Sequence, residues 1–289
     1  MAIRTILAPL SGGAASQGAA ETACRLALQF GAHLEALHVR PDPAEALPLL
    51  GADVVMPVAT ELIDRAVRES EETAAKAKAV FEAAVAHHAI PTRDMPAEGD
   101  TGVSACWREE QGHAPTVVAR RARVFDLVVL GQSGRVSDKA YTDTVEAAVM
   151  EGGRPVLLAP MRPIVPVGEI IAVAWNGSVE AAHAVAAAMP FLAKAREVHI
   201  LTAKDPEHSA AEADFPDYLA WHGIRAACHT VRPVDGVGTG ELVLEAARDQ
   251  GADLLVMGGY GRAPWREMIF GGTTRQVVGM SRLPLLLAH

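Results

Sequence analysis

The sequence predicts an α/β fold in which a doubly wound, parallel, five-stranded sheet occurs twice in tandem. The first observation is an internal repeat: the segment 125–131 returns in similar form at 252–258, and 155–159 returns at 284–288. The second is the alternation of short apolar runs with alanine-rich segments, because parallel strands are joined by crossovers that are usually helices. The third is that the apolar runs are continuous, which indicates a sheet buried on both faces.

The second half shows its elements most clearly. Its short runs are rich in β-branched residues and leucine, and its alanine-rich segments carry apolar residues at helical spacing. We predict strands over 169–175, 197–203, 224–231, 253–257 and 284–288, and helices over 179–193, 208–222, 239–250 and 273–281. Ligands of such sheets bind beyond the carboxyl ends of the strands where the winding reverses, which directs attention to the loops after the first and fourth strands.

The first half follows the same order with a long insertion before its fourth strand. We place the insertion near 41–88, where a proline-bearing stretch is followed by a helix over 61–88 that contains no breaker. The stretch 160–166 contains three prolines, which cannot sustain a helix or a central strand. We therefore expect domains at 1–160 and 169–289, joined by a linker at 161–168.

Composition argues against several functional classes. The 289 residues carry a formal net charge of -9, which repels phosphate backbones and anionic membrane surfaces. No stretch reaches the roughly 18 apolar residues of a membrane span. The three cysteines are far apart and odd in number, which favours a reducing compartment. We expect a cytoplasmic protein with neither nucleic acid nor membrane as a partner.

A glycine-rich loop follows the fourth strand of the second half. It contains Gly258-Gly259-Tyr260-Gly261, nine residues from Arg262 to Phe270, and Gly271-Gly272-Thr273-Thr274 at the start of a helix. Glycines let backbone N–H groups approach an anion closely, and a helix N-terminus adds donors and partial positive charge. The loop is therefore a candidate phosphate site, and a surface loop rich in turn residues is the alternative.

The spacing of Gly258, Gly261 and Gly271, after an apolar strand that begins with Asp253, resembles the nucleotide-binding signature of the universal stress proteins. The resemblance covers the whole chain as a tandem pair. It implies Rossmann-like sheets of the adenine-nucleotide-binding type that bind ATP or another adenine nucleotide, with or without Mg²⁺. The implied nucleotide-binding residues are Ala174, Asn176, Ala203, Met257, Gly258, Tyr260, Gly261, Arg262, Gly271, Gly272, Thr273 and Thr274.

Several positions depart from the family pattern. Asn176 stands where the family commonly has an aspartate that contacts the nucleoside, and Gly272 replaces a small hydroxyl residue. In the first half, Thr142 and Asp143 stand where the third glycine and its small neighbour belong. We therefore expect weak or no ATP binding in the first half.

The resemblance also implies that the last strands, 155–159 and 284–288, pair edge to edge and form a pseudo-dimer within the chain. Such pairing would cover two strand edges that are otherwise open to aggregation. A further homodimer and unidentified protein partners are left open.

The resemblance favours nucleotide binding in a stress-response regulatory protein. One alternative is a slow ATPase or a nucleotidyl-transfer enzyme of the same fold group, although no catalytic residue is predicted. A third reading is a ligand-free scaffold for protein contacts, which Trp175 would support if its ring fills the adenine pocket.

Other candidates favour structural roles. The segment 11–16 resembles the pyrophosphate loop of the N-type ATP pyrophosphatases, but Ala15 replaces its acidic residue, and we expect a turn with Ser16 as a helix cap. Cys106 has no histidine at a motif spacing. His87 and His88 end the long helix, which favours a solvated terminus over a metal site, and no metal ligand is predicted.

Overall fold

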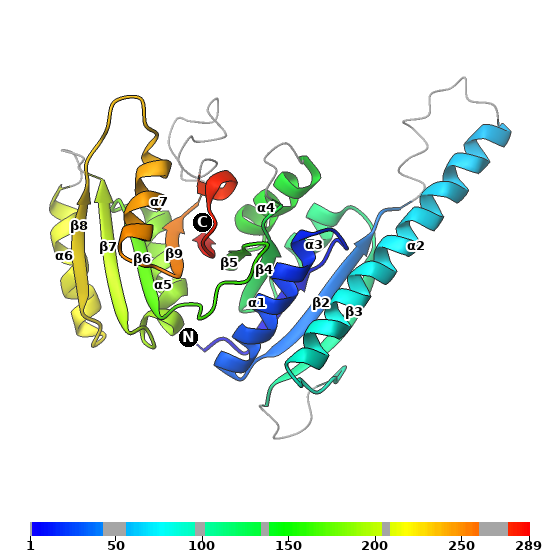
Figure 1. Ribbon diagram of the computed structural model, residues 1–289, viewed down its shortest axis with the longest axis horizontal. Helices are drawn as coiled ribbons and strands as arrows, with labels where there is room; N and C mark the ends of the chain where they lie inside the picture. The colour runs from blue at the N-terminus through cyan, green and yellow to red at the C-terminus, as the bar shows by residue number, and fades with distance from the viewer. Residues whose placement is uncertain (1, 43–55, 96–101, 134–138, 204–208, 260–276) are drawn as a thin grey trace.

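The computed structural model describes residues 2–42, 56–95, 102–133, 139–203, 209–259 and 277–289 (Figure 1). The first half contains β1 (Thr5–Pro9), α1 (Ala15–Phe30), β2 (His33–Arg40), α2 (Met56–His87), β3 (Ser104–Gln111), α3 (Ala114–Ala122), β4 (Leu127–Gly131), α4 (Lys139–Glu151) and β5 (Val156–Ala159). The second contains β6 (Ile170–Trp175), α5 (Val179–Leu192), β7 (Glu197–Ala203), α6 (Ser209–Trp221), β8 (Ala226–Val231), α7 (Thr239–Asp249), β9 (Leu254–Gly258) and β10 (Leu285–Ala288).

The strands form one ten-stranded sheet in the order β3-β2-β1-β4-β5-β10-β9-β6-β7-β8. Within each half every pairing is parallel, as the apolar runs predicted. The halves meet where β5 and β10 pair antiparallel, with Leu157 opposite Leu286, so the expected pairing of the last strands is present. Because this pairing is antiparallel, the carboxyl ends of the strands in the two halves point to opposite edges of the sheet.

Helices cover both faces of the sheet. One buried cluster joins residues of α1, α2, α5 and α6 to one face, and a second joins residues of α3, α4 and α7 to the other. Both clusters contain residues of both halves, and Phe30 of α1 meets Phe191 of α5 edge to face at 4.8 Å between ring centroids. The central strands β4, β5 and β10 are buried throughout, as predicted, whereas the edge strands β3 and β8 have exposed positions.

The predicted insertion helix is α2, which has 32 residues where its counterpart α6 has 13. Its C-terminal part packs through Ala77, Phe81 and Ala84 into the core shared with α1. Figure 1 shows α2 at the end of the molecule that is distant from the second half, where it runs on beyond the strands.

The connection between β5 and β6 contains neither helix nor strand, and Val167 within it is buried. Of the predicted helix 273–281, the described residues 277–280 are helical. None of the helices in the described ranges combines the length and the hydropathy of a membrane span.

Candidate functional site

The carboxyl edge of the second half brings together the strand ends that the sequence indicated. β6 lies between β9 and β7, and the order of the strands reverses on either side of it. Ala174 of β6 pairs in register with Met257 of β9; Met257 belongs to the buried cluster on the α7 face, and Ala174 is partly buried and packs against that cluster. Trp175 is opposite Thr202, which places Ala203, the last residue of β7, at the same edge.

The turn that follows β6 positions the N-terminus of α5 at this edge. Asn176 Oδ1 accepts a hydrogen bond from the Ser178 backbone N–H at 3.1 Å, and Ser178 Oγ accepts one from the Ala181 N–H at 3.1 Å. Asn176 therefore shapes the turn, and Ser178 caps the helix. A helix N-terminus held at this point directs partial positive charge toward the edge.

Gly258 permits the close approach of α5 to β9. A Cβ at this position would lie 2.6 Å from the Ala181 backbone nitrogen and 2.9 Å from Glu180 Cβ. Any side chain at Gly258 would therefore displace the first turn of α5. The glycine that the sequence singled out for phosphate approach also has a packing role.

The first half repeats this packing at its own carboxyl edge. A Cβ at Gly131 would lie 2.1 Å from the Ala15 carbonyl oxygen at the start of α1. In this half α2 also approaches the edge closely: a Cβ at Gly12 would lie 2.6 Å from the Thr73 carbonyl oxygen of α2. The insertion helix therefore covers the loop after β1. Thr142 and Asp143 lie within the first turns of α4.

Sequence reasoning missed two histidines beside the candidate site. His289 Nδ1 lies 3.2 Å from the Gly259 carbonyl oxygen, and His183 Nδ1 of α5 lies 3.1 Å from the His289 carbonyl oxygen. The two histidines are far apart in the chain and match no motif, so only the packing of α5 beside β10 brings them together. Tyr260, Gly261, Arg262 and the predicted residues Gly271, Gly272, Thr273 and Thr274 lie outside the described residues.

Trp175 points to the face of the sheet opposite Ala174 and Met257. It packs against the cluster on the α5 and α6 face, and its ring stacks on that of Phe215 with 4.1 Å between centroids. Phe215 is itself buried on α6. The ring of Trp175 is thus engaged in packing between the sheet and α6.

The expectation that Ser16 caps the helix is wrong. α1 begins at Ala15 with Ala14 as its N-cap residue, and no side chain caps it. Ser16 Oγ instead accepts a hydrogen bond from the Gly12 N–H at 3.0 Å, because the side chain turns back over the loop.

The structure also places a histidine beside Cys106, which sequence spacing did not reveal. His33 Nε2 lies 3.4 Å from Cys106 Sγ, and His33 Nδ1 lies 2.9 Å from Ser104 Oγ. Burial, with Glu35 adding to it, raises the pKa of the Cys106 thiol to about 11. A thiol with so high a pKa is protonated near neutral pH and is a poor nucleophile.

The two repeated aspartates, Asp126 before β4 and Asp253 before β9, bind backbone N–H groups at the amino ends of the strands, which lie opposite the carboxyl edge of each half. Asp126 Oδ2 accepts from the backbone N–H groups of Arg4 and Thr5 at 2.8 and 3.0 Å. Asp253 accepts from the N–H groups of Gly168, Glu169 and Ile170 at 2.5, 3.1 and 3.0 Å. These repeated residues therefore fix the beginnings of β1 and β6 and lie far from the carboxyl edge.

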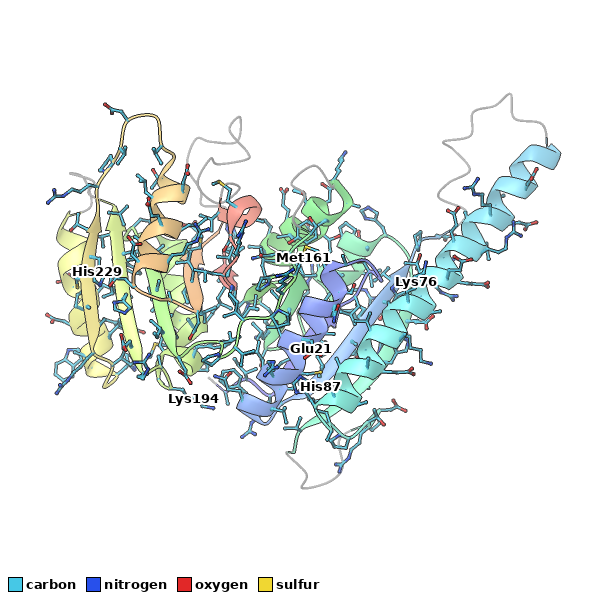
Figure 2. The ribbon with its side chains drawn as sticks, viewed as in Figure 1. Glu21, Lys76, His87, Met161, Lys194 and His229 are labelled. Carbon is cyan, nitrogen blue, oxygen red and sulfur yellow. The ribbon has the colours of Figure 1, made fainter. Side chains whose placement is uncertain are left out.

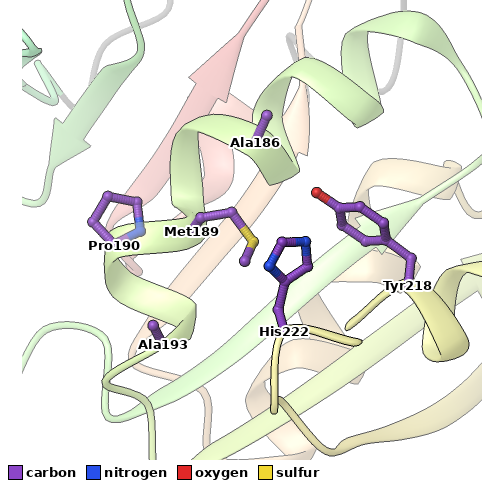
Figure 3. Close-up of a pocket in the computed structure, with 6 residues that line it drawn as sticks. All are labelled: Ala186, Met189, Pro190, Ala193, Tyr218 and His222. Atoms are coloured by element: carbon purple, nitrogen blue, oxygen red, sulfur yellow. The ribbon is translucent and has the colours of Figure 1, made fainter. Parts of the chain in front are cut away.

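A shallow groove lies between α5 and α6 (Figure 3). Its lining residues are Ala186, Met189, Pro190, Ala193, Tyr218 and His222. Because α5 begins at the carboxyl edge and the groove lies along its later turns, the groove is separate from the candidate nucleotide site.

Comparisons with known proteins agree with this architecture. The sequence profile of the universal stress protein family matches residues 2–160 and 227–289. A comparison with curated proteins gave no significant match. A universal stress protein from Archaeoglobus fulgidus DSM 4304 is similar in structure, with a TM-score of 0.69 and 17% identity over 98% of this chain and 95% of that chain.

A functionally unknown protein from Pseudomonas aeruginosa PAO1 is also similar, with a TM-score of 0.57 and 16% identity over 99% of this chain and 92% of that chain. At these identities the two structures support the fold alone. The family profile covers most of the chain and includes parts of both halves. The chain therefore belongs to the universal stress protein family.

Proposed function

We propose that this chain binds one adenine nucleotide, with ATP favoured, at the carboxyl edge of its second half, and acts as a stress-response regulatory protein. The observation that carries the proposal is the junction of β9 with α5, where Gly258 lets the helix N-terminus approach the start of the glycine-rich loop. Backbone N–H groups and a helix N-terminus at a point of strand reversal suit a phosphate group.

In this proposal the site is made by Asn176, by the ends of β6, β7 and β9, and by the loop that begins at Gly258. Asn176 can still accept or donate hydrogen bonds, although one of its lone pairs serves the turn to Ser178. The glycines let main-chain donors surround the phosphates, with or without Mg²⁺. Thr273 and Thr274 add hydroxyl groups.

We further propose that the first half binds the nucleotide weakly or not at all. Asp143 lies in the first turns of α4, where its carboxylate would repel a phosphate by roughly 1–4 kcal/mol at a separation of about 4 Å. The backbone of α2 at Thr73 also covers the loop at Gly12. Both features reduce the room and the charge complementarity available to a triphosphate.

Calorimetric titration of the nucleotide-stripped protein with ATP, with and without Mg²⁺, tests the proposal through the number of sites per chain. We expect one site, which Gly271→Asp abolishes because it introduces a carboxylate beside the phosphates. Gly134→Asp, at the matching loop of the first half, is the control and should leave the site intact. Two sites would contradict the asymmetry, and no binding by heat or by thermal stabilisation would contradict the nucleotide proposal itself.

A phosphate-release assay on the same samples separates binding from turnover. If the protein binds ATP without hydrolysing it, phosphate release by the wild type equals the background release of the Gly271→Asp variant. Steady ATP turnover by the wild type that this variant lacks would favour the enzyme alternative.

A further inference from the structure

Two histidines and a carboxylate from distant parts of the chain meet between α1 and α2. Glu21 lies in the middle of α1, His87 is the last residue of α2, and His88 follows it in a turn. Glu21 Oε2 is 2.8 Å from His88 Nε2, and one ligand atom from each of the three residues lies within 4.8 Å of the others. Figure 2 labels Glu21 on α1 and His87 at the end of α2 that packs beside it.

Two of these three side chains are already held in place. The His88 side chain is 9% exposed and that of Glu21 is 19% exposed, and the hydrogen bond between them fixes both. The turn that presents His88 is closed by hydrogen bonds from the Ala89 N–H to the Ala86 carbonyl and from the Ile90 N–H to the Val85 carbonyl. Ordering of the remaining side chain, His87, is the main conformational cost of assembling the group.

The third side chain, His87, is exposed. Its ring stands at 80° to that of His88, with 4.9 Å between the centroids. Both imidazoles also lie at the C-terminal end of a 32-residue helix, where the helix dipole favours a cation.

We propose that Glu21, His87 and His88 form a binding site for a divalent transition-metal ion of the Zn²⁺ type. Imidazole nitrogen and carboxylate oxygen are ordinary zinc ligands, with bonds of about 2.0–2.2 Å, which place two ligands of a tetrahedral ion about 3.3 Å apart. To bind the ion, the distance between Glu21 Oε2 and His88 Nε2 must increase slightly from 2.8 Å. A small rotation of the His87 side chain must bring its ring nitrogen closer to the other two ligand atoms. Water completes the coordination.

A purely structural role for the same residues makes different predictions. In that case the Glu21–His88 pair joins α1 to α2, and His87 contributes nothing because it is exposed. The exposed His87 is therefore the informative residue, since its removal leaves the helix contact intact but removes one of three ligands.

The experiment is a titration of the metal-free protein with Zn²⁺ against a chromophoric chelator, with the melting temperature recorded in parallel. We expect one site per chain. His87→Ala should weaken Zn²⁺ binding by about tenfold or more while the metal-free melting temperature stays unchanged. His222→Ala, which removes another exposed histidine in the second half, is the matched control and should bind as the wild type does.

Two further measurements keep the outcome decisive. Glu21→Gln retains a hydrogen-bonding group beside His88 and should also weaken binding. Co²⁺ added to the wild type should give the intense visible absorption of a four-coordinate ion, which needs no variant. Equal Zn²⁺ affinity in the wild type and His87→Ala, or no binding that competes with the chelator, would overturn the proposal.

Discussion

At the scale of single residues, His33 shows how burial couples protonation to stability. Burial lowers the pKa of His33 below 6.5, and Glu35 opposes the shift in part. The unfolded chain therefore takes up the proton first as the pH falls, and the native state loses stability below about pH 6.5. The stability that the neutral His33 gives to the native state is fully present above this pH, and it is lost as the pH falls toward the lower pKa of the folded state.

We predict that His33→Gln, which does not titrate, reduces the decline in unfolding free energy between pH 7.5 and pH 5. Urea denaturation at several pH values measures the difference between variant and wild type. His222→Gln, on the exposed surface of the second half, is the control. Identical pH dependence of wild type and His33→Gln would contradict the expectation.

Ala89 occupies a backbone conformation that favours glycine. Its φ is 51°, and it follows α2 at the position that Gly31, with a φ of 65°, occupies after α1. A Cβ in the left-handed region is unfavourable by roughly 1–2 kcal/mol. We expect Ala89→Gly to raise the unfolding free energy by about 0.5–1 kcal/mol, because the greater entropy of unfolded glycine offsets part of the gain. Chemical denaturation of the variant and the wild type measures this change in unfolding free energy.

The matched substitution Gly31→Ala should change stability in the opposite direction by about 1 kcal/mol. A loss of stability in Ala89→Gly would show that the Cβ of Ala89 makes contacts that outweigh its backbone strain.

At the scale of elements, Asp253 connects the start of β9 to the start of β6. Burial raises the pKa of this carboxyl group, although the three backbone N–H donors from residues 168–170 oppose the shift. Asp253→Ala would leave these donors without their partner. We predict that Asp253→Ala lowers the unfolding free energy by about 3 kcal/mol, which denaturant titration measures.

Asp126→Ala should have the same direction of effect, because Asp126 holds the start of β1 in the same way. Asp253→Asn keeps an acceptor and should lose less than Asp253→Ala. A change in ATP stoichiometry without a loss of stability would contradict the structural role, since Asp253 lies at the edge away from the proposed site.

At the scale of the whole molecule, the two halves share one sheet and two cores. Besides the β5–β10 pairing, Gln132 Nε2 donates to the Leu283 carbonyl at 3.1 Å, and Lys194 Nζ donates to the Gln29 carbonyl at 2.9 Å. Lys194 Nζ also lies 4.6 Å from the centre of the Phe30 ring. These contacts join the two halves through the sheet and through side chains on both sides of the junction, so we expect their folding to be coupled.

We therefore predict one cooperative thermal transition, seen by calorimetry and by tryptophan fluorescence at a common midpoint. Leu286→Ala, at a fully buried position opposite Leu157, should lower the unfolding free energy by about 2–5 kcal/mol and shift the whole transition. Leu28→Ala, where the side chain is 47% exposed, is the control and should change stability little. Two separate transitions in the wild type would contradict this coupling.

Much of the fold could be predicted because its signals are local or repeated. Continuous apolar runs marked β4, β5, β9 and β10, and the repeat showed that they occur in the same order twice. The long helix before β3 followed from apolar residues at helical spacing. The candidate site was predicted only in part: the strand ends at Ala174 and Met257 lie side by side, but the histidines at 183 and 289 carry no sequence signal.

The sequence by itself determined the α/β class, the tandem repeat and the strands and helices, because periodicity and turn residues act over a few neighbouring positions. Only the tertiary structure decided that Asp253 supports the amino edge, that His33 touches Cys106, and that Glu21 meets His88. These contacts join residues from separate elements, and their geometry depends on how the helices and strands pack. Helical periodicity places Glu21 on a face of α1, but the packing of α2 determines what that face meets.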